Sequence, residues 1–180
     1  ETGKIGAIGG FALPDVVCWL EGYRFGALDA DPDIEVTIAY IDSFDDIALG
    51  KEAALAQISA GADCIIHIAD AAGIGVIQAC QQEGVWAIGF AFDQNALAPE
   101  TVITSAMVDY GKMVVDAVGE IKDGTFEFGI THSYGLASGA VPLADYYGLV
   151  PEDIAAEAED IQQRIIDGEI EVPVVYEPTE

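Results

Sequence analysis

The feature that most constrains the fold of this 180-residue chain is a regular alternation of short apolar segments with longer, helix-like segments. The apolar segments are rich in Val and Ile, are nearly continuous in apolar residues and end in short turns, as strands buried on both faces do. The predicted strands are Lys4–Gly9, Glu35–Ile41, Asp63–Ile68, Val85–Phe90 and Thr101–Ala106. Strands that alternate with helices over short connections indicate an α/β fold with a parallel, doubly wound sheet flanked by helices.

The predicted helices have recognisable ends. Pro14 suits the first turn of a helix that runs to about Asp29, and Gly61, Gly84 and Gly124 follow three later helices. The later helices are expected from the Asp42–Asp46 turn to about Ala60, over Gly73–Gln82 and Tyr110–Lys122, and from Pro151 to Gly168. Two weaker segments remain: Phe126–Ile130 reads as a strand, and Glu171–Tyr176 as an edge strand or a terminal tail.

The charge excludes several classes of partner. Asp and Glu number 32 against 6 Lys and Arg, which gives a formal net charge of -26. Such a surface repels nucleic-acid phosphates and anionic lipid, so no nucleic acid is expected as a partner. The acids are scattered over predicted helix faces, which favours adaptation to high salt, because salt screens their mutual repulsion. Calcium binding is the alternative, but no segment has the spacing of an EF-hand loop.

The three cysteines form no metal-ligand pattern, and the sequence implies neither a metal site nor a cofactor. Cys64 falls in a predicted buried strand, whereas Cys18 and Cys80 fall in predicted helices. We therefore expect free, buried thiols, with a Cys64–Cys80 disulfide as the alternative.

The glycine turn at residues 67–80 (HIADAAGIGVIQAC) invites comparison with phosphate-binding motifs. A dinucleotide fingerprint needs G-x-G-x-x-G after the first strand, whereas here Gln78 takes the place of the third glycine and the turn follows the third strand. Nor does a Gly-Lys-Ser/Thr sequence occur. Two interpretations remain: Ala71 and Gly73 form the small-residue floor of a ligand cleft beside a helix N-terminus, or the turn is only a tight connection.

In a doubly wound sheet, ligands bind beyond the carboxyl ends of the strands. The turns expected there carry aromatic rings beside carboxylates and amides, which suit a small polar ligand that is neutral or cationic. The candidate ligand-binding residues in these turns are Phe11, Phe44, Asp70, Phe92, Asp93, Gln94 and Asn95.

Signals for catalysis are weaker, and we predict that the chain is not an enzyme. His67 lies inside a predicted strand and His132 near a loop, and no serine sits in a G-x-S-x-G elbow. Asp45 and Asp46 could act as a carboxylate pair, but capping the next helix is the simpler role.

Five segments in order resemble one protein family. They are TGKIGAIGG, IDSFDDIALGKEAALAQISAGADCII, AAGIGVIQA, AIGFAFDQNALAP and VITSAMVDYGKMVVDAV. Together they resemble the BMP/PnrA-like basic membrane lipoproteins, which are substrate-binding proteins of ABC importers with a type I periplasmic-binding fold. The resemblance runs from about Gly3 to Pro173. It implies two α/β lobes joined by a hinge, with a ligand between them, and purine nucleosides are the best-known ligands.

The resemblance also implies a domain organisation. Residues 1–100 would be the core of the second lobe, residues 101–124 a strand and helix that cross the hinge to the first lobe, and residues 125–180 a return segment with a C-terminal helix and tail. A helix that crosses to an absent lobe would expose apolar surface, so we expect a homodimer or a companion chain. The family further implies an ABC permease as partner and a periplasmic or extracellular location, with a lipid anchor in the full-length form.

Transfer of the family's ligand residues gives a mixed result. Ile66 stands before the glycine turn, where nucleoside-binding relatives have an aromatic residue. Ala91 replaces the family's ribose-binding acid, whereas Asp93 keeps the acidic residue that follows it in the family. Val108, next to Asp109, stands where a lysine is common. Asp70 adds an acid where glycine is typical. We therefore predict non-catalytic binding of a small polar or aromatic solute, nucleoside-like or cationic, for uptake. The alternative is the ligand-sensing module of a receptor or regulator.

Overall fold

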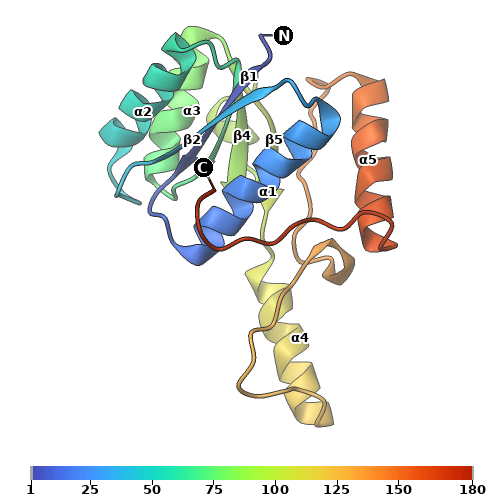
Figure 1. Cartoon of the computed structure of the whole chain (residues 1–180). Coiled ribbons are helices and arrows are strands. Elements are labelled where there is room, and N and C mark those ends of the chain that lie inside the picture. The colour runs from blue at the N-terminus through green and yellow to red at the C-terminus, as the bar shows by residue number, and fades with distance from the viewer. Residues whose placement is uncertain (1, 180) are drawn as a thin grey trace.

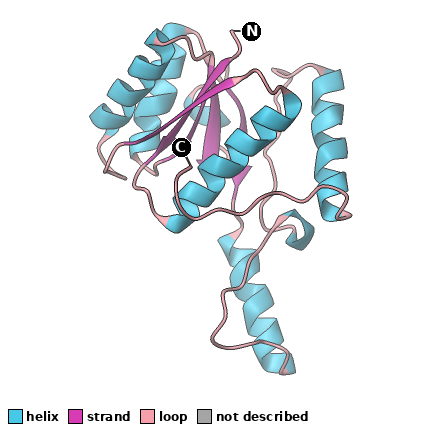
Figure 2. Cartoon of the chain, in the orientation of Figure 1, coloured by secondary structure: helices cyan, strands magenta, loops and turns pink. Residues whose placement is uncertain are grey.

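The computed structural model describes residues 2–179 and contains a parallel sheet with helices on both faces (Figures 1 and 2). Five strands pair in the order β2-β1-β3-β4-β5. Their bounds are β1 (Lys4–Gly9), β2 (Glu35–Tyr40), β3 (Cys64–Ile68), β4 (Trp86–Ala91) and β5 (Val102–Met107). The predicted α/β fold is confirmed, and every strand except the edge strands β2 and β5 has a parallel neighbour on both sides.

The helices are α1 (Pro14–Ala30), α2 (Ile47–Ser59), α3 (Ala72–Glu83), α4 (Tyr110–Asp123) and α5 (Glu152–Ile166), with short 3-10 turns at Asn95–Leu97 and Leu136–Ser138. Helix α1 covers one face of the sheet, where Val16 and Leu20 pack on Ile66 and Ile68. Helices α2 and α3 cover the other face and pack against each other. Burial on both sides explains why the strands are almost entirely apolar.

Local chemistry sets the helix ends. Pro14 occupies the first turn of α1, as predicted. The carboxylate of Asp46 accepts hydrogen bonds from the backbone N–H groups of Ala48 (2.9 Å) and Leu49 (3.1 Å), which confirms its role as the cap of α2. Gly84 and Gly124 follow α3 and α4 with φ of 71° and 74°, a conformation that favours glycine.

The segment predicted to cross the hinge, residues 101–124, begins with a strand of this sheet, since β5 pairs with β4. That the segment crosses to another lobe stays a prediction. The chain leaves the body of the molecule only after Met107, where α4 projects away from the sheet (Figure 1). The strand stays because Val102, Thr104 and Ser105 are buried against its neighbours.

The predicted strand at Phe126–Ile130 is wrong. In the part of the chain that the structure describes, no strand pairs with these residues; instead the N–H groups of Thr125 and Phe126 donate to the carbonyl of Glu120 at the end of α4. The Phe126 ring stacks on His132, with centroids 4.3 Å apart. Of the two interpretations for Glu171–Tyr176, the tail is the one observed. This tail is fixed at Thr179, whose N–H and hydroxyl both donate to the buried carboxylate of Glu21 on α1.

The cysteines are free thiols, as favoured by the sequence, and the alternative Cys64–Cys80 disulfide is not formed; only Cys80 is fully buried, whereas Cys18 and Cys64 are partly exposed. Burial raises the pKa of both Cys64 and Cys80 to about 12, so neither is ionised at neutral pH. Across the described residues 2–179, no helix has the length and apolar character needed to cross a membrane.

Candidate ligand site

The strand order reverses between β1 and β3. From β1 the chain moves outward to β2, and it then returns to the other side of β1 to form β3 and β4. In an open parallel sheet, connections that diverge at such a point leave a crevice at the carboxyl ends of the strands, where ligands bind. A cavity of about 140 Å³ lies there. It is lined by Asp15, Val16, Trp19, Phe44, Ile68, Asp70, Phe90 and Tyr110.

Aromatic rings form much of the cavity wall. Trp19 comes from α1, Phe44 from the turn after β2, Phe90 from β4 and Tyr110 from the first turn of α4. Trp19 and Phe90 meet edge to face with ring centroids 5.2 Å apart, a favourable geometry for an aromatic pair. This contact fixes Trp19 beside a ring that is only 8% exposed.

Two carboxylates share the cavity with these rings. Asp15 lies in the first turn of α1, and Asp70 follows β3. Asp70 has φ of 45°, the left-handed region, and Asp42 and Ala91 at the ends of two other strands also have positive φ. Such conformations cost of order 1–3 kcal/mol each and cluster at binding sites. No Lys or Arg lines the cavity among the described residues, so its only formal charges are negative.

The structure brings part of the predicted site together. Phe44 and Asp70 line the same cavity, and the ring of Phe11 packs on that of Phe44 with centroids 5.2 Å apart. Ala71 is exposed directly after Asp70, at the start of α3. These four residues come from the turns after β1, β2 and β3, which the parallel sheet places at one edge.

The residues after β4 lie in a separate turn. Phe92 is 62% exposed, and neither it nor Asp93 lines the cavity. The Asp93 carboxylate accepts hydrogen bonds from the N–H of Asn95 (3.0 Å) and from the hydroxyl of Tyr147. Asp109 caps α4 by accepting from the N–H of Lys112 (2.8 Å), next to the cavity residue Tyr110.

Gln94 and Gly73 take part in an internal network. The side-chain oxygen of Gln94 accepts from the N–H of Phe90 (2.9 Å) and lies 2.8 Å from Nε2 of His67. Because a backbone N–H only donates, this oxygen is an acceptor and Nε2 of His67 must be the donor. Gly73 lies so close to this histidine that a Cβ there would be 2.0 Å from Nδ1. The glycine turn is therefore a tight packing junction, and its role in ligand binding remains a prediction.

Comparison with known proteins agrees with the geometry. The family model of the ABC transporter substrate-binding proteins described as PnrA-like matches residues 1–175. The chain belongs to this family. Basic membrane protein A2 of Borrelia garinii is 36% identical over 176 residues, which are 96% of this chain and 52% of that protein. The ABC transporter nucleoside-binding protein BmpA of Lactococcus lactis is 33% identical over 191 residues, with 96% of this chain and 54% of that protein covered.

A solved structure supports the same fold. The ABC transporter solute-binding protein from Conexibacter woesei superposes with a TM-score of 0.77 at 28% identity, over 98% of this chain and 59% of that one. The PnrA-like chain described here thus spans about half the length of the curated relatives it matches.

Three polar or aromatic cavity residues of this PnrA-like chain, and the apolar Val16 and Ile68, were missed from its sequence. Asp15 and Trp19 are four residues apart on α1, a spacing that places both on one side of a helix following a strand end. Tyr110 opens the helix after β5. The signal available was their position just after a predicted strand, but only packing of α1 and α4 shows that their side chains meet Phe44 and Asp70.

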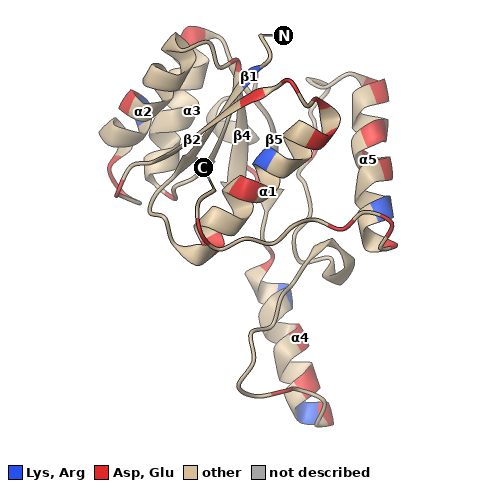
Figure 3. Cartoon of the chain, viewed as in Figure 1, with Lys and Arg blue, Asp and Glu red and all other residues tan. Residues whose placement is uncertain are grey.

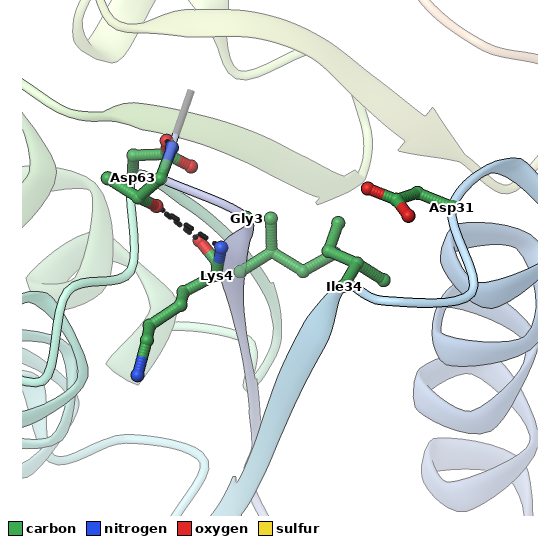
Figure 4. Close-up of a pocket in the computed structure, with 7 residues that line it drawn as sticks. Gly3, Lys4, Asp31, Ile34 and Asp63 are labelled. Atoms are coloured by element: carbon green, nitrogen blue, oxygen red, sulfur yellow. Dashed lines mark hydrogen bonds between the residues drawn. The ribbon is translucent and has the colours of Figure 1, made fainter.

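A larger depression of about 460 Å³ lies at the amino-terminal ends of the strands, where β1 and β2 begin (Figure 4). Gly3, Lys4, Asp31, Ile34 and Asp63 line it with two neighbouring residues. It contains no aromatic ring and lies away from the strand carboxyl ends, so the smaller cavity is the better candidate. Within residues 2–179, no group of three or more His, Cys, Asp or Glu side chains is arranged to hold a metal ion.

Proposed function

We propose that the chain binds a small polar or aromatic solute, without chemical conversion, as part of a protein that delivers it to the permease of an ABC importer. The observation that carries this proposal is the aromatic and acidic cavity at the switch point between β1 and β3. Membership of the PnrA-like family supports it. A nucleoside-like ligand is one candidate, since the similar Lactococcus lactis protein is described as nucleoside-binding.

The groups considered for acid–base chemistry have structural roles that support a non-catalytic function. Asp46 caps α2, and His67 is fully enclosed in the Gln94 network, where burial lowers its pKa to about 4. Neither lines the cavity. A periplasmic or extracellular location, with a lipid anchor in the full-length form, follows from the same family and belongs to the proposal.

A partner that covers α4 is also part of the proposal. This helix has no buried residue, although apolar side chains follow one another along it. The relatives extend over about twice the length of this chain, so a companion α/β segment or a second copy would supply the missing surface. A partner that covers α4 would also approach the cavity, because Tyr110 belongs to this helix and lines the cavity.

Isothermal titration calorimetry tests the proposed function. We expect the chain to bind a nucleoside such as adenosine or a small amine, and Phe44→Ala to weaken binding by about 1–3 kcal/mol through loss of a buried ring contact. The double change Phe92→Ala and Asp93→Ala tests whether the turn after β4 belongs to the site. Binding that survives Phe44→Ala unchanged would show that the cavity is not the site.

A further inference from the structure

We propose that this cavity selects a compact organic cation, an ammonium ion whose nitrogen carries alkyl groups, over neutral and anionic solutes. The inference rests on the proposed function, because it names the ligand class of the same cavity. It combines three observations: the rings of the wall, the two carboxylates, and the absence of a basic side chain among the described lining residues.

The rings supply a surface that attracts cations. Trp19, Phe44, Phe90 and Tyr110 come from four different elements and line one cavity. The faces of aromatic rings carry negative electrostatic potential, and several rings around one point form the cage used to bind alkylated ammonium ions. Neutral aromatic ligands also stack on such rings, so the rings alone do not decide the charge.

The carboxylates decide the charge. Asp15 and Asp70 line the cavity, and the nearest basic residue along α4, Lys112, is held in an ion pair with Asp116 at 2.8 Å. An anion would therefore meet two negative charges without compensation. Both carboxylates are exposed and keep water when a neutral ligand binds, whereas a cation also gains attraction from their charge.

The remaining wall favours an alkylated nitrogen over a primary amine. Val16 and Ile68 are apolar and buried, and among the described lining residues only Asp15, Asp70 and Tyr110 have side-chain oxygen atoms. A primary ammonium has three N–H donors that lose water on binding and need partners. An alkylated ammonium presents CH groups to these walls and keeps its charge. The volume of about 140 Å³ is large enough for such a head group.

The electrostatic field of the whole molecule also favours a cationic ligand. Asp and Glu positions are marked along all five helices of the ribbon in Figure 3, and Lys and Arg positions are few. With a net charge of -26, the protein raises the local concentration of cations and lowers that of anions near its clefts.

Calorimetry with matched probes tests the inference. The probes are choline, its neutral isostere 3,3-dimethyl-1-butanol, and adenosine as a neutral nucleoside. The test variant is Asp70→Asn, and the matched control is Asp42→Asn. Both aspartates are exposed, follow a strand and have positive φ (45° and 55°), but only Asp70 lines the cavity. Asparagine tolerates this backbone conformation, so both variants should keep the fold. Asp15→Asn serves as a second test variant.

We expect choline to bind and its neutral isostere not to bind. Asp70→Asn and Asp15→Asn should each raise the Kd for choline by about tenfold, as loss of one nearby charge predicts, and Asp42→Asn by less than about twofold. Binding of adenosine without choline would overturn the cation inference and leave the proposed solute-binding function standing. Equal binding of choline and its isostere would also overturn it. If none of the three probes and no other small solute bound, the proposed function itself would fail.

Discussion

At the residue scale, the turn after β3 combines a packing junction with part of the cavity wall. Gly73 lies against the buried ring of His67, whose Nε2 donates to Gln94 and whose Nδ1 has no hydrogen-bond partner in the structure. Three residues earlier, Asp70 turns the chain in the left-handed conformation and faces the cavity. A short segment thus connects the position of a candidate ligand group to the packing of α3 on the sheet.

Because Gly73 contacts His67 closely, we expect one added methyl group at residue 73 to lower the stability of the protein. Gly73→Ala would place Cβ 2.0 Å from Nδ1 of His67, so the ring or the helix must move, and such overpacking costs about 1–3 kcal/mol. Gly22→Ala is the control, since Cβ there meets nothing within 4 Å and alanine is a better helix former. Urea unfolding should give a lower midpoint for Gly73→Ala and an equal or higher one for Gly22→Ala. Equal midpoints for wild type and Gly73→Ala would contradict the packing.

Burial of His67 should make the free energy of unfolding depend on pH. Burial lowers its pKa to about 4 in the folded protein, whereas about 6.5 is usual in an unfolded chain. Between these values the unfolded state binds more protons, so the free energy of unfolding falls as pH decreases from about 6.5 to about 4, by up to about 3 kcal/mol. His67→Gln should reduce this slope, as measured by urea unfolding across that range. An unchanged slope in His67→Gln would refute the assignment.

At the scale of elements, the five strands and the five helices could be predicted from the sequence because each has a strong local signal. Val- and Ile-rich runs, Pro14 at a first turn, and glycines after α3 and α4 all lie where the structure confirms them. The strand predicted at Phe126–Ile130 is wrong because an apolar run is not sufficient for a strand. Its aromatic rings pack locally instead, Phe126 on Phe128 and on His132. Strand formation depends on pairing, which the segment's own residues do not determine.

The candidate site was predictable only in part. Phe44 and Asp70 follow predicted strands, and the carboxyl edge of a parallel sheet brings such turns together. Trp19 and Asp15 depend on how α1 lies across that edge, which is a matter of tertiary packing. Gln94 looked like a ligand residue, but its oxygen is occupied by Phe90 and His67 inside the protein.

The exposed apolar side of helix α4 indicates that the chain associates with another copy or another protein. Its exposed apolar side chains are Tyr110, Val114, Val115, Val118 and Ile121. In isolation we expect the chain to self-associate through this helix, and Val115→Glu with Val118→Glu to shift it toward monomer. Val172→Glu, at an exposed position in the tail, is the control. Sedimentation equilibrium would measure the masses, and a wild-type chain that remained monomeric at all concentrations would contradict the prediction.

For the whole molecule, charge is the dominant feature. A net charge of -26 on 180 residues opposes compaction through self-repulsion. Raising NaCl from about 0.05 M to about 1 M shortens the screening length to about 3 Å, so the urea midpoint should rise with salt. A midpoint that is independent of NaCl would argue against adaptation to a saline environment.

The location of the ligand on the sheet is the central claim, and NMR chemical-shift mapping with choline and adenosine as probes tests it most directly. We expect the backbone amides perturbed by a bound probe to cluster at the carboxyl ends of the strands, around Phe44, Asp70 and Tyr110. The amides of Gly3, Ile34 and Asp63 should stay unchanged, although they line the larger depression at the amino-terminal ends. Perturbations confined to those amino-terminal ends would contradict the account.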